Sequence, residues 1–194
     1  MDYIVANYLE LIAVAAGIAG VYLTTKQIIW CWPVSVVNVV LSAIVFYQSK
    51  LYQDALLQVF YFVMAVYGFY FWMKGGENHQ EAIVQKINKT LLIFIIIVGI
   101  ISNFILGYLF NRYTDAALPY WDAASFTWGV IGTFLMARKI LENWIVWIII
   151  DLICCGIFFY KELYGFTVLY FVFTILAIYG YNNWRNSMIK QVLI

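Results

Sequence analysis

Charged residues are scarce in this chain. Asp, Glu, Lys and Arg make up 11% of its 194 residues, whereas a soluble domain averages about 25%. Hydrophobic residues account for 65%, which is more apolar surface than one small core can bury, so lipid must solvate part of it. The sequence therefore predicts an integral membrane protein. A formal net charge of +1 provides no basic patch, so we expect no nucleic-acid partner.

Groups that carry enzyme or metal chemistry are also rare. His79 is the only histidine, which excludes a His-based metal centre. Of the three cysteines, Cys154 and Cys155 fall inside an apolar run and are expected to be packing residues rather than a disulfide, while Cys31 has no evident partner. The chain has no Gly-x-x-x-x-Gly-Lys-Ser/Thr loop and no Ser/His/Asp or Cys/His set. We therefore expect no enzyme, no cofactor and no metal.

Long apolar runs dominate what is present. Each is close to the ~20 residues that an α-helix needs to cross hydrocarbon. The runs lie at about residues 4–24, 28–48, 55–73, 90–110, 119–137, 143–160 and 165–184. Between the third and fourth runs, the polar segment from Lys74 to Lys89 is expected to be a loop. Pro33 and Pro119 lie near the starts of their runs, where a missing N–H costs little. The pattern predicts an all-α protein with seven transmembrane helices.

The distribution of Lys and Arg predicts the orientation of these helices. Seven spans place the two chain ends on opposite sides of the membrane. Eight basic residues fall on the side of the C-terminus and three on the side of the N-terminus. We therefore expect a cytoplasmic C-terminus and an external N-terminus.

The front of the chain resembles its back, which indicates an internal repeat. Two pairs of segments share their pattern: residues 46–52 match 159–164 at an offset of 113, and Tyr67-Gly68 with Trp72 matches Tyr179-Gly180 with Trp184 at an offset of 112. At the first offset, Asn38 aligns with Asp151. Residues 1–74 and 112–194 are then three-helix copies, and residues 75–111 supply the polar loop and a connecting fourth helix.

A copy shifted by four helices keeps its orientation in the membrane. The two copies are therefore expected to be parallel repeats, related by an axis along the membrane normal. In such folds the substrate binds near the middle of the bilayer between the repeats, where Asn38 and Asp151 would face each other.

The sixth apolar run carries the sharpest candidate site. In a helix, Trp144, Trp147 and Asp151 at i, i+3 and i+7 share one face. A carboxylate inside an apolar segment costs several kcal/mol unless it faces a wet cavity or a partner, and two indoles form a wall for a flat or cationic ring. The alternatives are a protonated acid bonded to a neighbouring helix and, for Trp144 near the helix end, an interfacial aromatic residue.

Further polar and aromatic residues are candidates to bind the same ligand. Asn38 binds a ligand or only ties helices together. Gln58 and Tyr61 lie one turn apart in the third run, and Tyr170 is the repeat mate of Gln58. Asp122 either belongs to the site or stabilises the start of its helix through the helix dipole.

Several motifs together are similar to a known family. They are Trp144-x-x-Trp147-x-x-x-Asp151, Leu57-Gln58-x-x-Tyr61, Pro119-Tyr120-x-Asp122-Ala123, Arg138-Lys139 followed by Glu142-Asn143-Trp144, and the paired Tyr-Gly segments that end in Trp72 and Trp184. Over nearly the whole chain they resemble the Pnu family of bacterial vitamin transporters, in particular its PnuC-type members.

The resemblance implies a fold and a function. Members have seven core helices in a 3+1+3 arrangement similar to the SWEET sugar transporters, lie in the bacterial inner membrane and are described as homotrimers. PnuC-type members take up nicotinamide riboside, which a cytoplasmic kinase phosphorylates, and relatives carry thiamine or riboflavin. The family motif admits Asn or Asp where this chain has Asp151. We therefore expect a passive uniporter for nicotinamide riboside. A thiamine or riboflavin transporter, a proton-coupled symporter in which Asp151 or Glu10 titrates, and a membrane-embedded enzyme or sensor are the alternatives.

Overall fold

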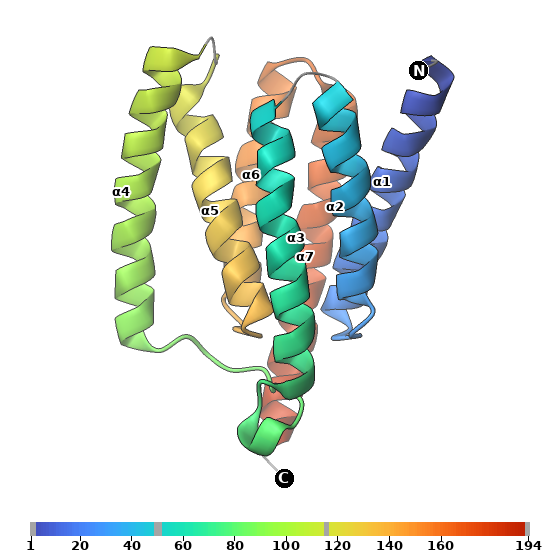
Figure 1. The fold of residues 1–194 in the computed structure, drawn as a ribbon. Helices are drawn as coiled ribbons and strands as arrows, with labels where there is room; N and C mark the ends of the chain where they lie inside the picture. The colour runs from blue at the N-terminus through green and yellow to red at the C-terminus, as the bar shows by residue number, and fades with distance from the viewer. Residues whose placement is uncertain (1–2, 49–51, 115–116, 193–194) are drawn as a thin grey trace. The chain divides into compact units, whose positions relative to one another are not determined.

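Seven α-helices make up the computed structural model, which describes residues 3–48, 52–114 and 117–192 (Figure 1). The helices are α1 (Tyr3–Thr25), α2 (Cys31–Gln48), α3 (Tyr52–Lys74), α4 (Lys89–Tyr113), α5 (Pro119–Ala137), α6 (Asn143–Tyr160) and α7 (Tyr164–Val192). The predicted all-α, seven-helix fold is confirmed. The polar segment between α3 and α4 contains a short 3₁₀ turn, Glu77–His79, and an isolated β-bridge from Gln85 to Ile140. Helix α7 continues past the predicted end at residue 184.

Four helices, α2, α4, α6 and α7, are each long and apolar enough to cross a membrane among the residues that the structure describes. This composition makes the chain a multi-pass membrane protein. Helices α3 and α5 carry buried polar residues, including Gln58, Thr127 and Thr133. Polar side chains inside membrane helices typically face protein rather than lipid.

The chain divides into two compact units. The first contains α1 to α3 and the following residues up to Ile83, together with Ala137–Lys139, the last residue of α5 and the start of the turn after it. The second contains α4 to α7 apart from those three residues. Within it, α4 runs beside α5, where Gly107 lies against the ring of Tyr120 (Figure 1). The predicted three-part division at residues 74 and 111 stays a prediction.

Each unit contains the same pair of crossed tryptophans. In the first unit the rings of Trp32 and Trp72 meet edge-on, with centroids 5.4 Å apart and an interplanar angle of 86°. In the second unit Trp144 and Trp184 meet in the same way, at 5.4 Å and 89°. Such T-shaped pairs contribute about 0.5–1.5 kcal/mol beyond the area they bury. The predicted internal repeat is thus visible in the packing of both units.

The turn before α2 is repeated before α6. Gln27 and Lys139 both have left-handed backbones, with φ of 57° and 56°. The next amide in each case donates a hydrogen bond to the carbonyl five residues earlier, at 3.1 and 2.9 Å. This hydrogen bond, which spans six residues, ends α1 and α5 in the same way. The chain then reverses direction and enters the following helix.

The repeat has one offset, 112 residues, and this corrects the predicted pairing of Asn38 with Asp151. Helices α2 and α6 begin and end 112 residues apart, so Asp151 is equivalent to Val39 and Asn38 to Ile150. Val39 and Asp151 are both buried. The Phe-Tyr pairs at 46–47 and 159–160 are shifted by one residue relative to their helices, and one residue turns a helix face by about 100°.

Candidate functional site

Asp151 lies in the middle of α6 and is 4% exposed. Its carboxyl group forms no hydrogen bond and no ion pair with any described residue. Polar groups buried inside a membrane protein without a partner cost several kcal/mol, and they mark sites where a ligand or water supplies the missing partner. Asp151 is therefore the strongest candidate for a ligand contact in the second unit.

Trp147 lies one turn before Asp151 on the same face of α6, as the sequence predicted from their spacing. The indole is half-buried and covers Gly132 of α5, where an added Cβ would lie 3.1 Å from Cε2 of the ring. In the first unit the equivalent residue is Ser35, which lies against Gly20 in the same manner. The second unit thus has a large aromatic ring where the first has a small hydroxyl.

Trp144 is 2% exposed, because it is enclosed between α6 and α7. Its ring lies on Gly180 and meets Trp184 edge-on. Its indole Nε1, like Oδ1 of the neighbouring Asn143, has no hydrogen-bond partner among the residues described. These surroundings favour a packing role for Trp144, and its predicted contact with a substrate ring stays a prediction.

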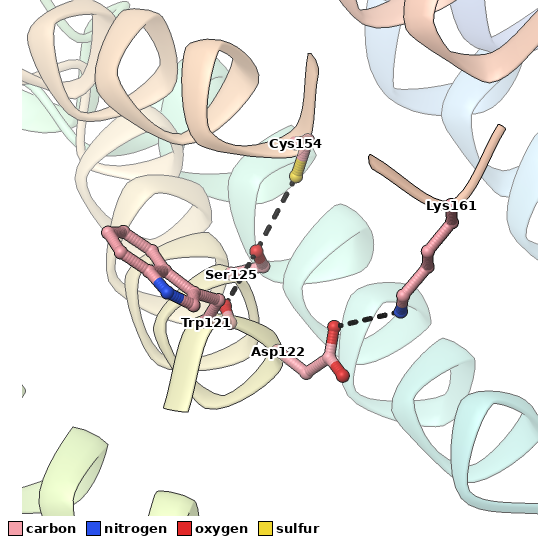
Figure 2. Close-up of polar contacts among 5 residues, drawn as sticks. All are labelled: Trp121, Asp122, Ser125, Cys154 and Lys161. Atoms are coloured by element: carbon pink, nitrogen blue, oxygen red, sulfur yellow. Dashed lines mark hydrogen bonds and ion pairs between the residues drawn. The ribbon is translucent and has the colours of Figure 1, made fainter. Parts of the chain in front are cut away.

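Asp122, in the first turn of α5, forms an ion pair that the sequence did not predict. Its Oδ1 lies 3.4 Å from Nζ of Lys161, the residue that follows α6, and both side chains are 30% exposed (Figure 2). Partly exposed pairs of this kind contribute about 0–1 kcal/mol. The pair bridges the ends of α5 and α6, and a substrate contact by Asp122 stays a prediction.

One turn further into α5, Ser125 links the same two helices. Its hydroxyl donates to the carbonyl of Trp121 at 3.1 Å and accepts from the thiol of Cys154 at 3.5 Å (Figure 2). Cys154 is buried and is a free thiol, as is Cys155. The expected packing role of Cys154 agrees with this contact.

Tyr170 of α7 belongs to an aromatic cluster that packs α7 on α6. Its ring stacks on Phe158, with centroids 5.2 Å apart and an interplanar angle of 27°, and meets Phe173 edge-on. Phe158 stacks in turn on Phe166. The ring of Tyr170 is therefore in contact with two other aromatic rings, and its predicted contact with a substrate stays a prediction.

In the first unit, Gln58 of α3 is in a situation similar to that of Asp151. It is 8% exposed, and its amide forms no hydrogen bond within the described part of the chain. Tyr61, one turn along, is half-buried, with its ring 5.7 Å from that of Phe60. The amide of Gln58 can donate and accept, so it suits a ligand with hydroxyl or amide groups.

Asn38 of α2 uses one of its two N–H donors within the protein. Its Nδ2 donates to the carbonyl of Ala13 at 2.7 Å and lies against Gly17, so it ties α2 to α1. No donor of the described residues reaches its Oδ1. The residue thus links two helices, and one acceptor remains for a ligand.

In the described part of the chain, three further buried polar groups without a hydrogen-bond partner were not predicted as candidates: Oδ1 of Asn103 in α4, the hydroxyl of Thr127 and the indole N–H of Trp32. The hydroxyl of Thr127 in α5 is buried without a partner, whereas Thr133 bonds the carbonyl four residues earlier. The indole N–H of Trp32 is also buried without a partner. An alignment at an offset of 112 would have identified Trp32 as the mate of Trp144. No sequence signal distinguishes Thr127 from Thr133, because both are threonines in the same apolar helix.

These groups are suited to binding a small molecule. The described residues contain no cluster of three His, Cys, Asp or Glu side chains that could hold a metal ion. What the helices offer is a carboxyl group, amides and an indole in a largely apolar environment, which is typical of membrane transporters for small polar molecules with a flat ring.

Comparison with known proteins agrees with this class. Residues 7–186 match the family model described as nicotinamide mononucleotide transporter. The nicotinamide riboside transporter PnuC of Escherichia coli (strain K12) is 27% identical over 206 residues, which is 93% of this chain and 86% of that protein. The riboflavin/roseoflavin transporter RibM of Streptomyces davaonensis is 25% identical, over 93% of this chain and 82% of its own.

A solved structure, the crystal structure of the vitamin B3 transporter PnuC, has the same fold. The TM-score is 0.75 at 20% identity, over 94% of this chain and 83% of the solved chain. The family match spans nearly all of the seven helices. The chain therefore belongs to the nicotinamide mononucleotide transporter family, and the resemblance to PnuC-type Pnu proteins that its motifs indicated is confirmed.

Proposed function

We propose that the protein takes up nicotinamide riboside across the bacterial inner membrane by facilitated diffusion. Two PnuC relatives, of Escherichia coli (strain K12) and of Neisseria mucosa, are named as transporters of this compound. The observation that carries the proposal is the buried Asp151, which has no hydrogen-bond or ion-pair partner among the described residues and lies one turn from the indole of Trp147. Nicotinamide riboside has a pyridinium ring, which needs an aromatic surface and a negative group.

The chemistry of the second unit suits that ring. A carboxylate in a low-dielectric environment attracts a pyridinium cation more strongly than it would in water, and the cation in turn removes the cost of the unpaired charge. The indole of Trp147 supplies a negative face for the same cation. The first unit by itself offers Gln58 and Oδ1 of Asn38, which are groups of the kind that bind hydroxyls or a carboxamide.

Transport is passive in this proposal, by alternating access. A binding site biases a carrier only toward states that it binds differently, so it cannot by itself build a gradient. Accumulation in the cell then requires a cytoplasmic kinase, because phosphorylation removes the riboside from the equilibrium. The excess of Lys and Arg on the side of the C-terminus supports a cytoplasmic C-terminus and an external N-terminus. The protein assembles as a homotrimer in this proposal, as the family resemblance implies.

Uptake into proteoliposomes tests the proposal. With labelled nicotinamide riboside outside and no kinase inside, the label should equilibrate and stop, and a riboside kinase with ATP inside should drive accumulation. Empty liposomes are the control for background entry of the label. The Asp151→Asn variant is the control for dependence of uptake on the carboxyl group. If the riboside fails to enter while another vitamin does, the fold remains and the substrate is wrong.

Riboflavin is the second candidate substrate, because RibM is a relative of similar coverage. Thiamine, also flat and cationic, is the third. Competition by each against labelled riboside separates them.

Proton-coupled symport is a different mechanism that the unpaired Asp151 also supports, since a buried acid in a membrane helix is a typical proton carrier. Substrate-dependent acidification of the liposome interior would demonstrate it, and its absence would leave uniport.

A further inference from the structure

The first unit contains a cavity that the transport proposal does not use. It has a volume of about 430 Å³, within the range typical of small-molecule sites. It lies where the turn after α1, the start of α2, the end of α3, the polar loop and the segment Ala137–Lys139 meet. Aromatic and polar side chains dominate its lining: Gln27, Trp30, Phe69, Trp72, Glu81 and Lys139.

Lys139 is the unusual member of this lining. It lies between α5 and α6 and is 7% exposed. Its ammonium group donates to the carbonyl of Ala82 at 2.7 Å and lies 4.8 Å from the ring centroid of Trp72. No carboxylate of the described residues reaches it at ion-pair distance. An ammonium has three N–H donors, so two remain for another acceptor.

A buried cation of this kind is costly until an anion joins it. The desolvation that comes with burial lowers the pKa of Lys139, while the negative charge of Glu81 acts in the opposite direction and favours the protonated form. Glu81 itself is exposed. Three further basic residues directly flank members of the lining in the chain: Lys26, Lys74 and Arg138. The chain segments that form the cavity therefore carry an excess of positive charge, which favours anions.

We propose that this cavity binds an organic phosphate. Its phosphate accepts hydrogen bonds from Lys139, and its flat or apolar body lies against Trp30, Phe69 and Trp72. A bare inorganic anion would leave these aromatic surfaces without a partner, and a neutral ring would leave the ammonium without one. The nearby carboxylate of Glu81 weakens the binding of any anion, so the affinity is moderate.

Two sources supply such a ligand. One is a nucleotide with a cytoplasmic phosphate, and the other is the headgroup of an anionic phospholipid. The choice of nucleotide rests on the proposed function, because phosphorylation of the transported riboside gives a pyridinium nucleotide in the cytoplasm. The count of Lys and Arg places the loops around this cavity on the same side of the membrane. Bound there, the product of the trapping step would report on the supply of vitamin.

Calorimetry on the full chain in detergent tests the site, with nicotinamide mononucleotide as the probe and nicotinamide riboside titrated separately. Saturable nucleotide binding is expected. Lys139→Gln should weaken it about tenfold or more, as expected for the loss of a charge-assisted contact. Glu81→Gln, at an exposed position that cannot endanger folding, should strengthen it roughly threefold. Trp30→Ala, 66% exposed, should weaken it, whereas Trp121→Ala, an exposed tryptophan outside the cavity, should not.

Nanodiscs separate the two sources. If the nucleotide affinity falls in discs with phosphatidylglycerol but not in discs of phosphatidylcholine alone, the lipid headgroup occupies the cavity. Absence of binding by both the nucleotide and short-chain phosphatidylglycerol would overturn the site, as would binding unchanged by Lys139→Gln and by Glu81→Gln. Riboside binding without phosphate binding would leave the transport proposal intact. If the wild-type protein binds the nucleotide but not the riboside, the transport proposal is refuted and the phosphate site in the cavity still stands.

Discussion

Gly180 of α7 lies directly beneath the indole of Trp144 of α6, so close that an added Cβ would come within 2.6 Å of three ring atoms. Gly180→Ala therefore forces the ring or the helix to move. Overpacking of this kind costs about 1–3 kcal/mol, so the midpoint of thermal unfolding should fall. Scanning fluorimetry on purified protein measures it.

Gly156 of α6 is the matched control, because no atom lies within 4 Å of the position of its missing Cβ. Gly156→Ala should leave stability unchanged or raise it, since alanine favours a helix. Gly68→Ala, beneath Trp32, should destabilise the chain as Gly180→Ala does. Equal effects at Gly156 and Gly180 would contradict the close packing.

Trp147→Ala tests the ring-binding surface. Loss of the indole should weaken nicotinamide riboside binding by roughly 1–2 kcal/mol, or about 5- to 30-fold in Kd, because a cation–π contact is removed. Titration calorimetry provides the Kd. Trp121→Ala, an exposed tryptophan of α5, is the control and should bind normally. Equal affinity in wild type and Trp147→Ala would place the site on another face.

Asp151→Asn separates charge from hydrogen bonding at the same site. The amide is close in shape to the carboxyl group but cannot neutralise a cation. If Asp151 pairs with the pyridinium ring, affinity for the riboside should fall severalfold or more, while affinity for a neutral vitamin such as riboflavin should change little. If Asp151→Asn leaves the affinity for both ligands unchanged, Asp151 acts only through hydrogen bonds.

The ion pair between Asp122 and Lys161 should contribute little to stability. Its groups are partly exposed, so a double-mutant cycle with Asp122→Asn and Lys161→Met should give a coupling free energy below about 1 kcal/mol, and added salt should reduce it. Chemical denaturation of the four proteins measures the coupling. A coupling well above this value would mean that the pair is shielded from solvent.

The helices could be predicted from the sequence because the thickness of hydrocarbon sets the length of an apolar run. The shared face of Trp147 and Asp151 followed from helix geometry alone. The burial of Trp144 did not, because it depends on a glycine 36 residues away on another helix. The ion pair between Asp122 and Lys161 could not be predicted either, because Lys161 lies beyond the end of α6 and no spacing rule relates the two positions. The register of the repeat was obscured because tyrosine and phenylalanine recur so often that a shift of one residue still gives matches.

The buried ammonium group of Lys139 makes stability depend on pH in the alkaline range. Because desolvation lowers its pKa in the folded chain below the ordinary value of 10.5, the unfolded chain binds this proton more tightly. Between the folded pKa and 10.5, the unfolded state therefore carries more of this proton, and the free energy of unfolding attributable to Lys139 rises with pH. Lys139→Gln has no proton to lose and should lack this contribution. The difference in unfolding midpoint between wild type and Lys139→Gln should thus shift in favour of wild type from pH 8 to pH 10, as measured by tryptophan fluorescence. A difference that stays constant, or that shifts toward the variant, would mean that the ammonium group is already compensated by an anion in the folded protein.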